Sequence, residues 1–172
     1  RPPSRASGRR IPRVTAPRVS IVIPTLNALA TLPAVHAAIA AQRTTLAWEL
    51  LVIDSSSTDG TVEWLKARGI RVEVIPRRAF NHGTTRNRAI EMTRGEFVAL
   101  LSQDAVPVGA GWLEALVQPL LARPQVAGTF ARQVPRDEAG AIARYYLSRW
   151  IAGGTEGRSV RLADAGALER LD

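Results

Sequence analysis

Residues 19–27 read VSIVIPTLN, a short run of β-branched and apolar residues that ends at a proline and a polar loop. Such a run predicts a strand, VSIVI at 19–23, that is buried in a sheet. Three further runs share the pattern, namely ELLVID at 49–54, RVEVI at 71–75 and EFVALLS at 96–102. The repetition predicts that strands form the centre of the fold.

Helices are predicted between these strands. The helical segments are Ala-rich residues 30–42, TVEWLKAR at 61–68 and TTRNRAIEMTR at 84–94. After the fourth strand, the pattern predicts a helix at 110–122, a strand at 126–134 and a helix at 137–150. Alternating strands and helices predict an α/β fold, with a mostly parallel sheet and helices on both of its faces.

The composition bounds the class of protein. The chain has 172 residues, of which 46% are hydrophobic and 22% charged, as expected of one globular domain. It has no cysteine, which excludes disulfides and thiolate metal sites. No apolar run approaches the roughly 20 residues of a spanning helix, so the default location is cytoplasmic.

The net charge of +8 is concentrated at the N-terminus, because residues 1–18 hold six arginines and no acid. We predict a disordered basic tail over 1–18, a globular domain over 19–150 and a weakly patterned segment over 151–172. Two interpretations of the tail stay open: peripheral contact with anionic lipid at the inner face of the cell membrane, or simple solvation. The nearly neutral remainder argues against binding to nucleic acid.

Polar side chains follow each of the four strands. These residues are Thr25 and Asn27, Asp54 and Ser55, Arg86, and Gln103 and Asp104. Because parallel strands end at the same edge of a sheet, the side chains are expected to share one crevice, where a nucleoside diphosphate fits. Arg86 could neutralise phosphate, and Asp104 could hold Mg²⁺ or Mn²⁺.

Other interpretations of these residues stay open. Asp54 or Asp59 could be a turn or helix-cap residue, and Asn27 could form an Asx turn. His82 is interpreted as a loop residue rather than a metal ligand. The glycine-rich motifs of dinucleotide-binding proteins and P-loop NTPases are absent, as is the GxSxG motif of serine hydrolases.

Five stretches together resemble the family 2 glycosyltransferases, most closely their bacterial rhamnosyltransferase-type branch. They are VSIVIPTLN, LLVIDSSSTDGT, FNHGTTRNRAI, GEFVALLSQDAVP and VAGTFARQVPR. The resemblance spans about residues 19–150. It implies a Rossmann-like fold of the GT-A type and an inverting hexosyltransferase that uses a nucleotide-diphospho-sugar donor and a divalent cation.

The resemblance also implies roles for single residues. Pro24, Thr25, Asn27, Asp54, Ser55, Arg86 and Gln103 would bind the nucleotide, and Asp104 would bind the metal. Gln103 stands where the family usually has a first acid, so Asp104 alone would supply the charge for the ion.

No residue is recognisable as the general base, which in the family lies well beyond the metal motif. We therefore expect an apparently truncated chain, with the donor-binding domain at 19–150 and the start of a missing acceptor and catalytic half at 151–172. The branch favours dTDP-rhamnose as donor and a glycan or lipid-linked acceptor in cell-envelope polysaccharide synthesis. A non-catalytic nucleotide-sugar binding or interaction module is the alternative.

Overall fold

The computed structural model describes residues 16–149, 153, 154 and 159. Most of the predicted tail, and nearly all of 151–172, therefore lies outside the described residues. Arg18, which the charge pattern placed in the tail, belongs to the fold. Its backbone N–H donates to the carbonyl of Ala47, and its guanidinium pairs with Glu96 at 3.0 Å.

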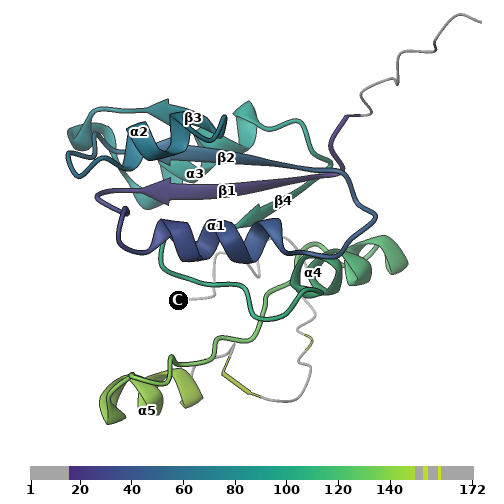
Figure 1. Cartoon of the computed structure of the whole chain (residues 1–172). Helices are drawn as coiled ribbons and strands as arrows, with labels where there is room; N and C mark the ends of the chain where they lie inside the picture. The colour runs from purple at the N-terminus through teal and green to yellow at the C-terminus, as the bar shows by residue number, and fades with distance from the viewer. Residues whose placement is uncertain (1–15, 150–152, 155–158, 160–172) are drawn as a thin grey trace, which may run out of the picture.

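Four parallel strands form the sheet in the order β3-β2-β1-β4, which confirms the predicted α/β fold (Figure 1). The strands are β1 (Val19–Thr25), β2 (Trp48–Asp54), β3 (Arg71–Val74) and β4 (Phe97–Leu100). The helices are α1 (Leu32–Ala40), α2 (Thr61–Lys66), α3 (His82–Met92), α4 (Trp112–Ala122) and α5 (Ala141–Arg149), with a 3₁₀ turn at Arg77–Ala79.

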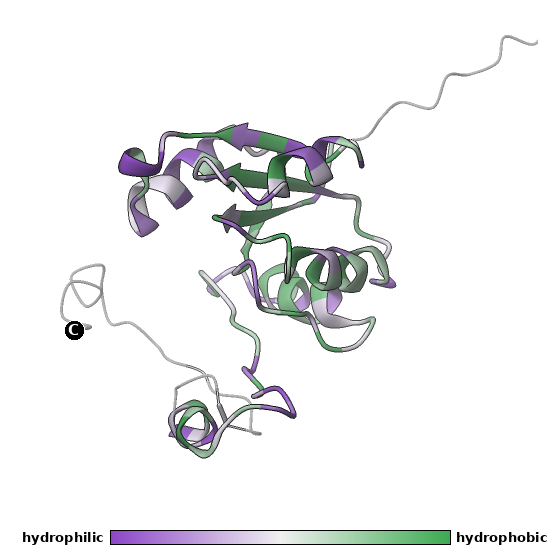
Figure 2. Cartoon of the chain, turned by 60° about the vertical axis from the view of Figure 1, so that its left-hand side comes forward, coloured by the Kyte–Doolittle hydropathy of each residue, from purple (hydrophilic) through white to green (hydrophobic). Residues whose placement is uncertain are grey.

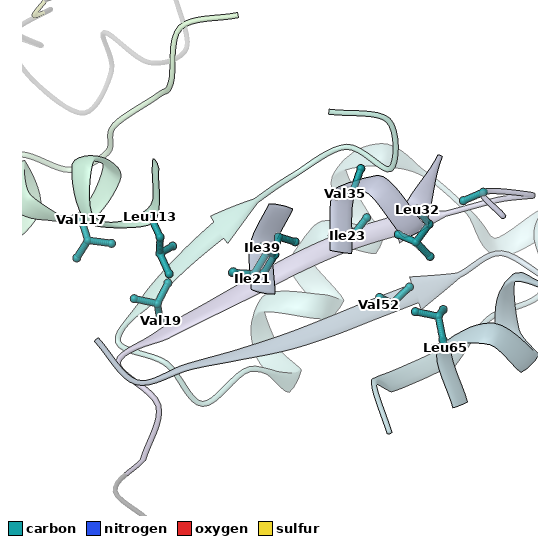
Figure 3. Close-up of a cluster of buried hydrophobic side chains, with 11 residues drawn as sticks. Val19, Ile21, Ile23, Leu32, Val35, Ile39, Val52, Leu65, Leu113 and Val117 are labelled. Atoms are coloured by element: carbon teal, nitrogen blue, oxygen red, sulfur yellow. The ribbon is translucent and has the colours of Figure 1, made fainter. Parts of the chain in front are cut away.

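Helices cover both faces of the sheet, as predicted for a parallel sheet. Alternate residues of β1 point to opposite faces, so Ile21 and Ile23 pack under α1, α2 and α4, while Val22 packs under α3. Figure 3 shows Ile39 of α1 beside Ile21, and the α4 side chains directed toward the start of β1. The central strands and α4 are coloured as hydrophobic in Figure 2.

The predicted strand at 126–134 is wrong, because this segment has no regular structure. A strand requires a partner for its backbone, and no described strand pairs with it. The hydroxyl of Thr129 instead donates to the carbonyl of Leu116 in α4, while Phe130 and Val134 are exposed. Helix α5 confirms the predicted helix at 137–150 and stands apart from the sheet in both views (Figures 1 and 2).

Among the described residues, no helix combines the length and the apolar character needed to cross a bilayer.

A polar network closes the amino edge of the sheet. Buried Ser20 of β1 lies in register with Glu49 of β2, and its hydroxyl donates to that carboxylate at 2.8 Å. Arg94 binds both carboxylate oxygens of Glu49, and the backbone N–H of Gly95 donates to the Ser20 hydroxyl. The network joins β1, β2 and the segment that leads into β4.

The network shifts the ionisation of Glu49. Burial raises the pKa of this carboxyl, but hydrogen bonds from Arg94 and Ser20 lower it further than burial raises it. The net pKa lies below the ordinary 4.5. The ionised carboxylate therefore stabilises the fold above pH 4.5, and this stabilisation is lost as the pH falls through the depressed pKa.

We predict that Glu49→Gln lowers the free energy of unfolding at pH 7 and weakens its dependence on pH below 4.5, since a neutral amide cannot ionise. Urea unfolding between pH 3 and 7 measures both effects. Glu138→Gln, the same change on an exposed turn, is the control and should change neither. Parallel pH profiles for Glu49→Gln and the unsubstituted chain would contradict the prediction.

Gly95 lies so close to the backbone of β1 that there is no room for a side chain at this position. A Cβ atom at this position would lie 2.6 Å from the backbone nitrogen of Ser20 and 2.8 Å from the carbonyl carbon of Val19. Both are backbone atoms of the buried central strand, so they cannot move aside easily. Helix α3 itself ends earlier, at Met92.

We therefore predict that Gly95→Ala destabilises the fold by about 1–3 kcal/mol, the usual cost of overpacking. Thermal and urea unfolding measure this loss. Gly128→Ala is the matched control, because a Cβ there meets no atom within 4 Å. Equal stabilities for the two variants would show that the 94–96 segment can shift away from β1.

Candidate functional site

The order of the strands reverses between β1 and β4, and ligands of parallel α/β sheets bind beside such a switch point. Here β1 extends beyond its pairing with β4. The pairing ends at Val22 and Leu100, while β1 continues to Thr25. The N–H of Leu101 still donates to the carbonyl of Val22, and the chain then leaves β1. The loops after β1 and β4 border this edge.

Asp54, the last residue of β2, is a buried acceptor at this edge. Its carboxylate accepts from the hydroxyl of Thr25 at 2.8 Å and from the backbone N–H and hydroxyl of Ser57 at 2.8 and 2.6 Å. Its side chain has no exposed surface. Two of the predicted site residues, Thr25 and Asp54, are therefore in direct contact, and the predicted contact of Asp54 with a base stays a prediction.

Asn27 extends the network from the β1 loop. Its φ of 49° lies in the left-handed region, which asparagine tolerates better than most residues. Its N–H donates to the Ser57 hydroxyl at 2.8 Å, and its side-chain carbonyl accepts from the N–H of Thr58 at 2.9 Å. The side chain thus binds the neighbouring loop across the sheet edge.

Asp59 is a turn residue, as one of the open interpretations proposed, because it lies before Gly60, the N-cap position of α2, and bonds the backbone two residues on. One carboxylate oxygen accepts from the N–H and hydroxyl of Thr61, and the other accepts from the N–H of Leu29. The slight burial raises the pKa of this carboxyl, and the hydrogen bonds lower it by more, so the net pKa is lowered. Thr61 in turn accepts from the N–H of Ala28. The SSSTDG stretch therefore fastens the loop after β1 to the loop after β2.

Gln103 joins the loops on either side of the switch point. Its side-chain carbonyl accepts from the N–H of Leu26 at 2.8 Å, and its amide N–H donates to the carbonyl of Leu26 at 3.2 Å. The next residue, Asp104, has an exposed side chain, and no described residue is hydrogen-bonded to its carboxylate. Arg136 donates to the backbone carbonyl of Asp104.

Among the described residues, the side chains of the remaining predicted residues make no hydrogen bond to this network. Pro24 is half-buried in β1, and Ser55 is buried after β2, where its N–H donates to the carbonyl of Thr25. Among the described residues, the Ser55 hydroxyl is the buried side-chain polar atom that has no partner. Arg86 is half-buried in α3 and approaches the carbonyl of His82 at 3.2 Å. His82, expected in a loop, is the first residue of α3.

The side chains at this edge fit a divalent cation whose other ligands are phosphate oxygens and water. The described residues contain no group of three or more histidine, cysteine or acidic side chains placed to hold a metal. Among the described acids at this edge, Asp104 is the one whose carboxylate accepts no hydrogen bond from another residue. Mg²⁺ and Mn²⁺ bind in proteins through as few as one carboxylate when phosphate oxygens and waters complete the shell.

Two surface hollows lie away from this edge. One, of about 490 Å³, is lined by Arg71, Arg94 and the end of α3, and another, of about 260 Å³, is lined by Arg132, Arg144 and their neighbours. Neither is lined by the candidate residues. The hydrogen-bond network and the strand order, rather than an enclosed cavity, define the candidate site.

A parallel sheet with polar side chains at its switch point is the architecture of Rossmann-like nucleotide-binding domains. The model of one family, described as Glycosyl transferase family 2, matches residues 20–162. The chain belongs to this family.

Three relatives illustrate the match. The chain is 34% identical over 128 residues to the O-antigen chain rhamnosyltransferase RfbN of Salmonella typhimurium, an alignment that covers 73% of this chain and 40% of that protein. The glucosyl-3-phosphoglycerate synthase of Mycobacterium tuberculosis, solved with Mn²⁺, UDP and phosphoglyceric acid, has a TM-score of 0.57 and 27% identity. That match covers 77% of this chain and 49% of the synthase chain.

The mannosyltransferase PcManGT of Pyrobaculum calidifontis, solved with GDP-Man and Mn²⁺, has a TM-score of 0.56 and 26% identity. It covers 79% of this chain, and this chain covers 39% of it. The chain thus spans less than half the length of each of the three relatives.

We predict that Asp54→Ala lowers the free energy of unfolding by about 1–3 kcal/mol, because Thr25 and Ser57 lose the acceptor of their buried donors. Urea unfolding measures the loss, and hydrogen exchange should accelerate at Ser57. Asp104→Ala is the control, since it removes an exposed carboxylate with no described partner. If both variants were equally stable, the carboxylate of Asp54 would not hold the two loops together.

Proposed function

We propose that this chain binds a nucleotide-diphospho-sugar at the carboxyl edge of its sheet, as the donor-binding part of a glycosyltransferase. The observation that carries the proposal is the Glycosyl transferase family 2 match over residues 20–162. The polar network beside the β1/β4 switch point supports it, because the network lies where parallel α/β folds bind nucleotides.

The nucleotide would lie across the loops that follow β1 and β2. Pro24, Thr25 and Asn27 would border it on one side and Asp54 and Ser55 on the other. Arg86, in the second turn of α3, would face the negatively charged diphosphate.

Asp104 would hold a divalent cation, Mg²⁺ or Mn²⁺, together with the diphosphate. When bound, such an ion supplies positive charge that stabilises the departing nucleoside diphosphate. Two of the relatives described above were solved with Mn²⁺ and a nucleotide, which supports an ion at this site. Asp104 contributes a carboxylate on an exposed loop, where both the ion and its water ligands have access.

Rhamnose is the sugar we propose, donated from dTDP-rhamnose to a growing glycan or lipid-linked acceptor in cell-envelope polysaccharide synthesis. The name of RfbN, an O-antigen chain rhamnosyltransferase at 34% identity, supports both the sugar and the kind of acceptor. The solved relatives bind uridine and guanosine nucleotides. A test of the base therefore needs a panel that includes dTDP, UDP and GDP.

A non-catalytic nucleotide-sugar binding module is the second candidate. At the described sheet edge, Asp54 and Asp59 are both engaged as hydrogen-bond acceptors, and Asp104 is assigned to the ion. No described carboxylate at that edge is then free to deprotonate an acceptor hydroxyl. Sugar transfer from donor to acceptor supports the enzyme, and donor binding without transfer supports the module.

We predict that Asp104→Ala reduces the Mn²⁺-dependent affinity for a nucleoside diphosphate by about 10- to 100-fold, because a charged ligand contributes about 1.5–3 kcal/mol. Calorimetric titration of dTDP, UDP and GDP, each with and without Mn²⁺, measures the change. The melting temperature should stay the same, since the Asp104 carboxylate is exposed and bonds no described residue.

Asp137→Ala, which removes a carboxylate from another exposed loop, is the matched control and should bind like the unsubstituted chain. Unchanged Mn²⁺ dependence in Asp104→Ala would remove this residue from the site. The absence of binding for every nucleotide in the unsubstituted chain would contradict the proposed function as a whole.

A further inference from the structure

Gln103 is bound three times to the connection between β1 and α1. Its side-chain amide bonds both the N–H and the carbonyl of Leu26, at 2.8 and 3.2 Å. Its backbone carbonyl accepts from the hydroxyl of Thr31 at 3.0 Å. Thr31 stands at the N-cap position of α1 yet caps no helix N–H, because its hydroxyl is directed to Gln103 and the carbonyl of Ala28 instead.

This pair of contacts suits an amide and no acid. Leu26 presents one donor and one acceptor, and a glutamine side chain offers the complementary acceptor and donor. An ionised carboxylate only accepts, so Asp or Glu at position 103 would leave the Leu26 carbonyl without its partner. Asparagine has the right groups on a shorter chain. The residue that departs from the acidic pattern is thus matched to the backbone it contacts.

We propose that Gln103 is a positioning residue that holds the β1–α1 loop in register with Asp104, and that it is not itself a ligand of the ion or the sugar. This inference rests on the proposed function, because it assigns Asp104 to the ion. Thr25 and Asn27 flank Leu26, and Asp104 follows Gln103 directly. One side chain therefore connects the loop that borders the nucleotide to the residue that holds the ion.

The neutral amide at position 103 also affects the charge of the site. With an amide at position 103, the ion has one protein carboxylate, and most of its remaining charge compensation must come from the diphosphate. Ion and nucleotide are then expected to bind together, each raising the affinity for the other by the same factor. Mn²⁺ alone should bind weakly.

The experiment compares Gln103→Met, which loses both side-chain bonds to Leu26, with Gln103→Glu, which keeps the bond to the Leu26 N–H and adds a carboxylate. Gln118→Met is the matched control, because Gln118 is exposed and donates only within α4, to Glu114. The first measurement, amide hydrogen exchange, requires no ligand. We expect exchange at Leu26 to accelerate about tenfold in Gln103→Met, less in Gln103→Glu and not at all in the control.

The second measurement is calorimetric titration of Mn²⁺ alone, and of dTDP, UDP and GDP with and without Mn²⁺. In both Gln103 variants, the factor by which Mn²⁺ tightens nucleotide binding should fall about fivefold or more. Gln103→Glu should bind Mn²⁺ alone no more tightly than the unsubstituted chain, despite its added carboxylate. A purely structural contact would change the melting temperature without changing this factor.

Three results would overturn the inference. Tighter Mn²⁺ binding by Gln103→Glu would make position 103 a metal-ligand position. An unchanged exchange rate at Leu26 would show that the Gln103 side chain does not hold the β1–α1 loop. An unchanged Mn²⁺ factor would show that this contact does not act on Asp104. Should Gln103→Met fail to fold, Gln103→Glu serves for both measurements. If no nucleotide binds the unsubstituted chain, the proposed function fails, while hydrogen exchange and the Mn²⁺ titration still test the contact between Gln103 and Leu26.

Discussion

The burial of β1 on both faces is the constraint on which the rest of the structure depends. A strand between two neighbours and two helical layers must satisfy every polar group it carries within the protein. β1 carries two buried hydroxyls, Ser20 near its start and Thr25 at its end. Each lies in register with an acid of β2, Glu49 and Asp54 respectively, and donates to it. The two polar edges of the sheet thus begin with the same kind of pair.

The two edges differ in how the acid is compensated. At the amino edge, Arg94 pairs with Glu49, and Gly95 packs directly against the backbone of β1. At the carboxyl edge, Asp54 receives hydroxyl and backbone donors only. The ion pairs among the described residues involve Glu96, Glu73 and Glu49, and none of them includes Asp54, Asp59 or Asp104. At that edge, the exposed carboxylate of Asp104 is the group that we propose for a cation.

The sequence predicted what depends on local pattern and could not predict what depends on contacts between distant residues. The four strands and the helices between them follow from apolar runs a few residues long, and the placement of Asp54 at a strand end follows from the same count. The strand expected at 126–134 has the right residues and no partner strand, which local composition cannot reveal. The bond between Gln103 and Leu26 joins residues 77 positions apart, and only the strand order brings them together.

An amide in place of an acid at position 103 reduces the negative charge at the switch point and increases the order of the β1–α1 loop. A second carboxylate would add negative charge, but it would repel the carboxylate beside it and leave the Leu26 carbonyl unpaired at a half-buried position. The amide adds no charge and binds both polar groups of Leu26. In the proposed complex the nucleotide would bring negative charge of its own, so Gln103 would contribute the position of the β1–α1 loop rather than charge.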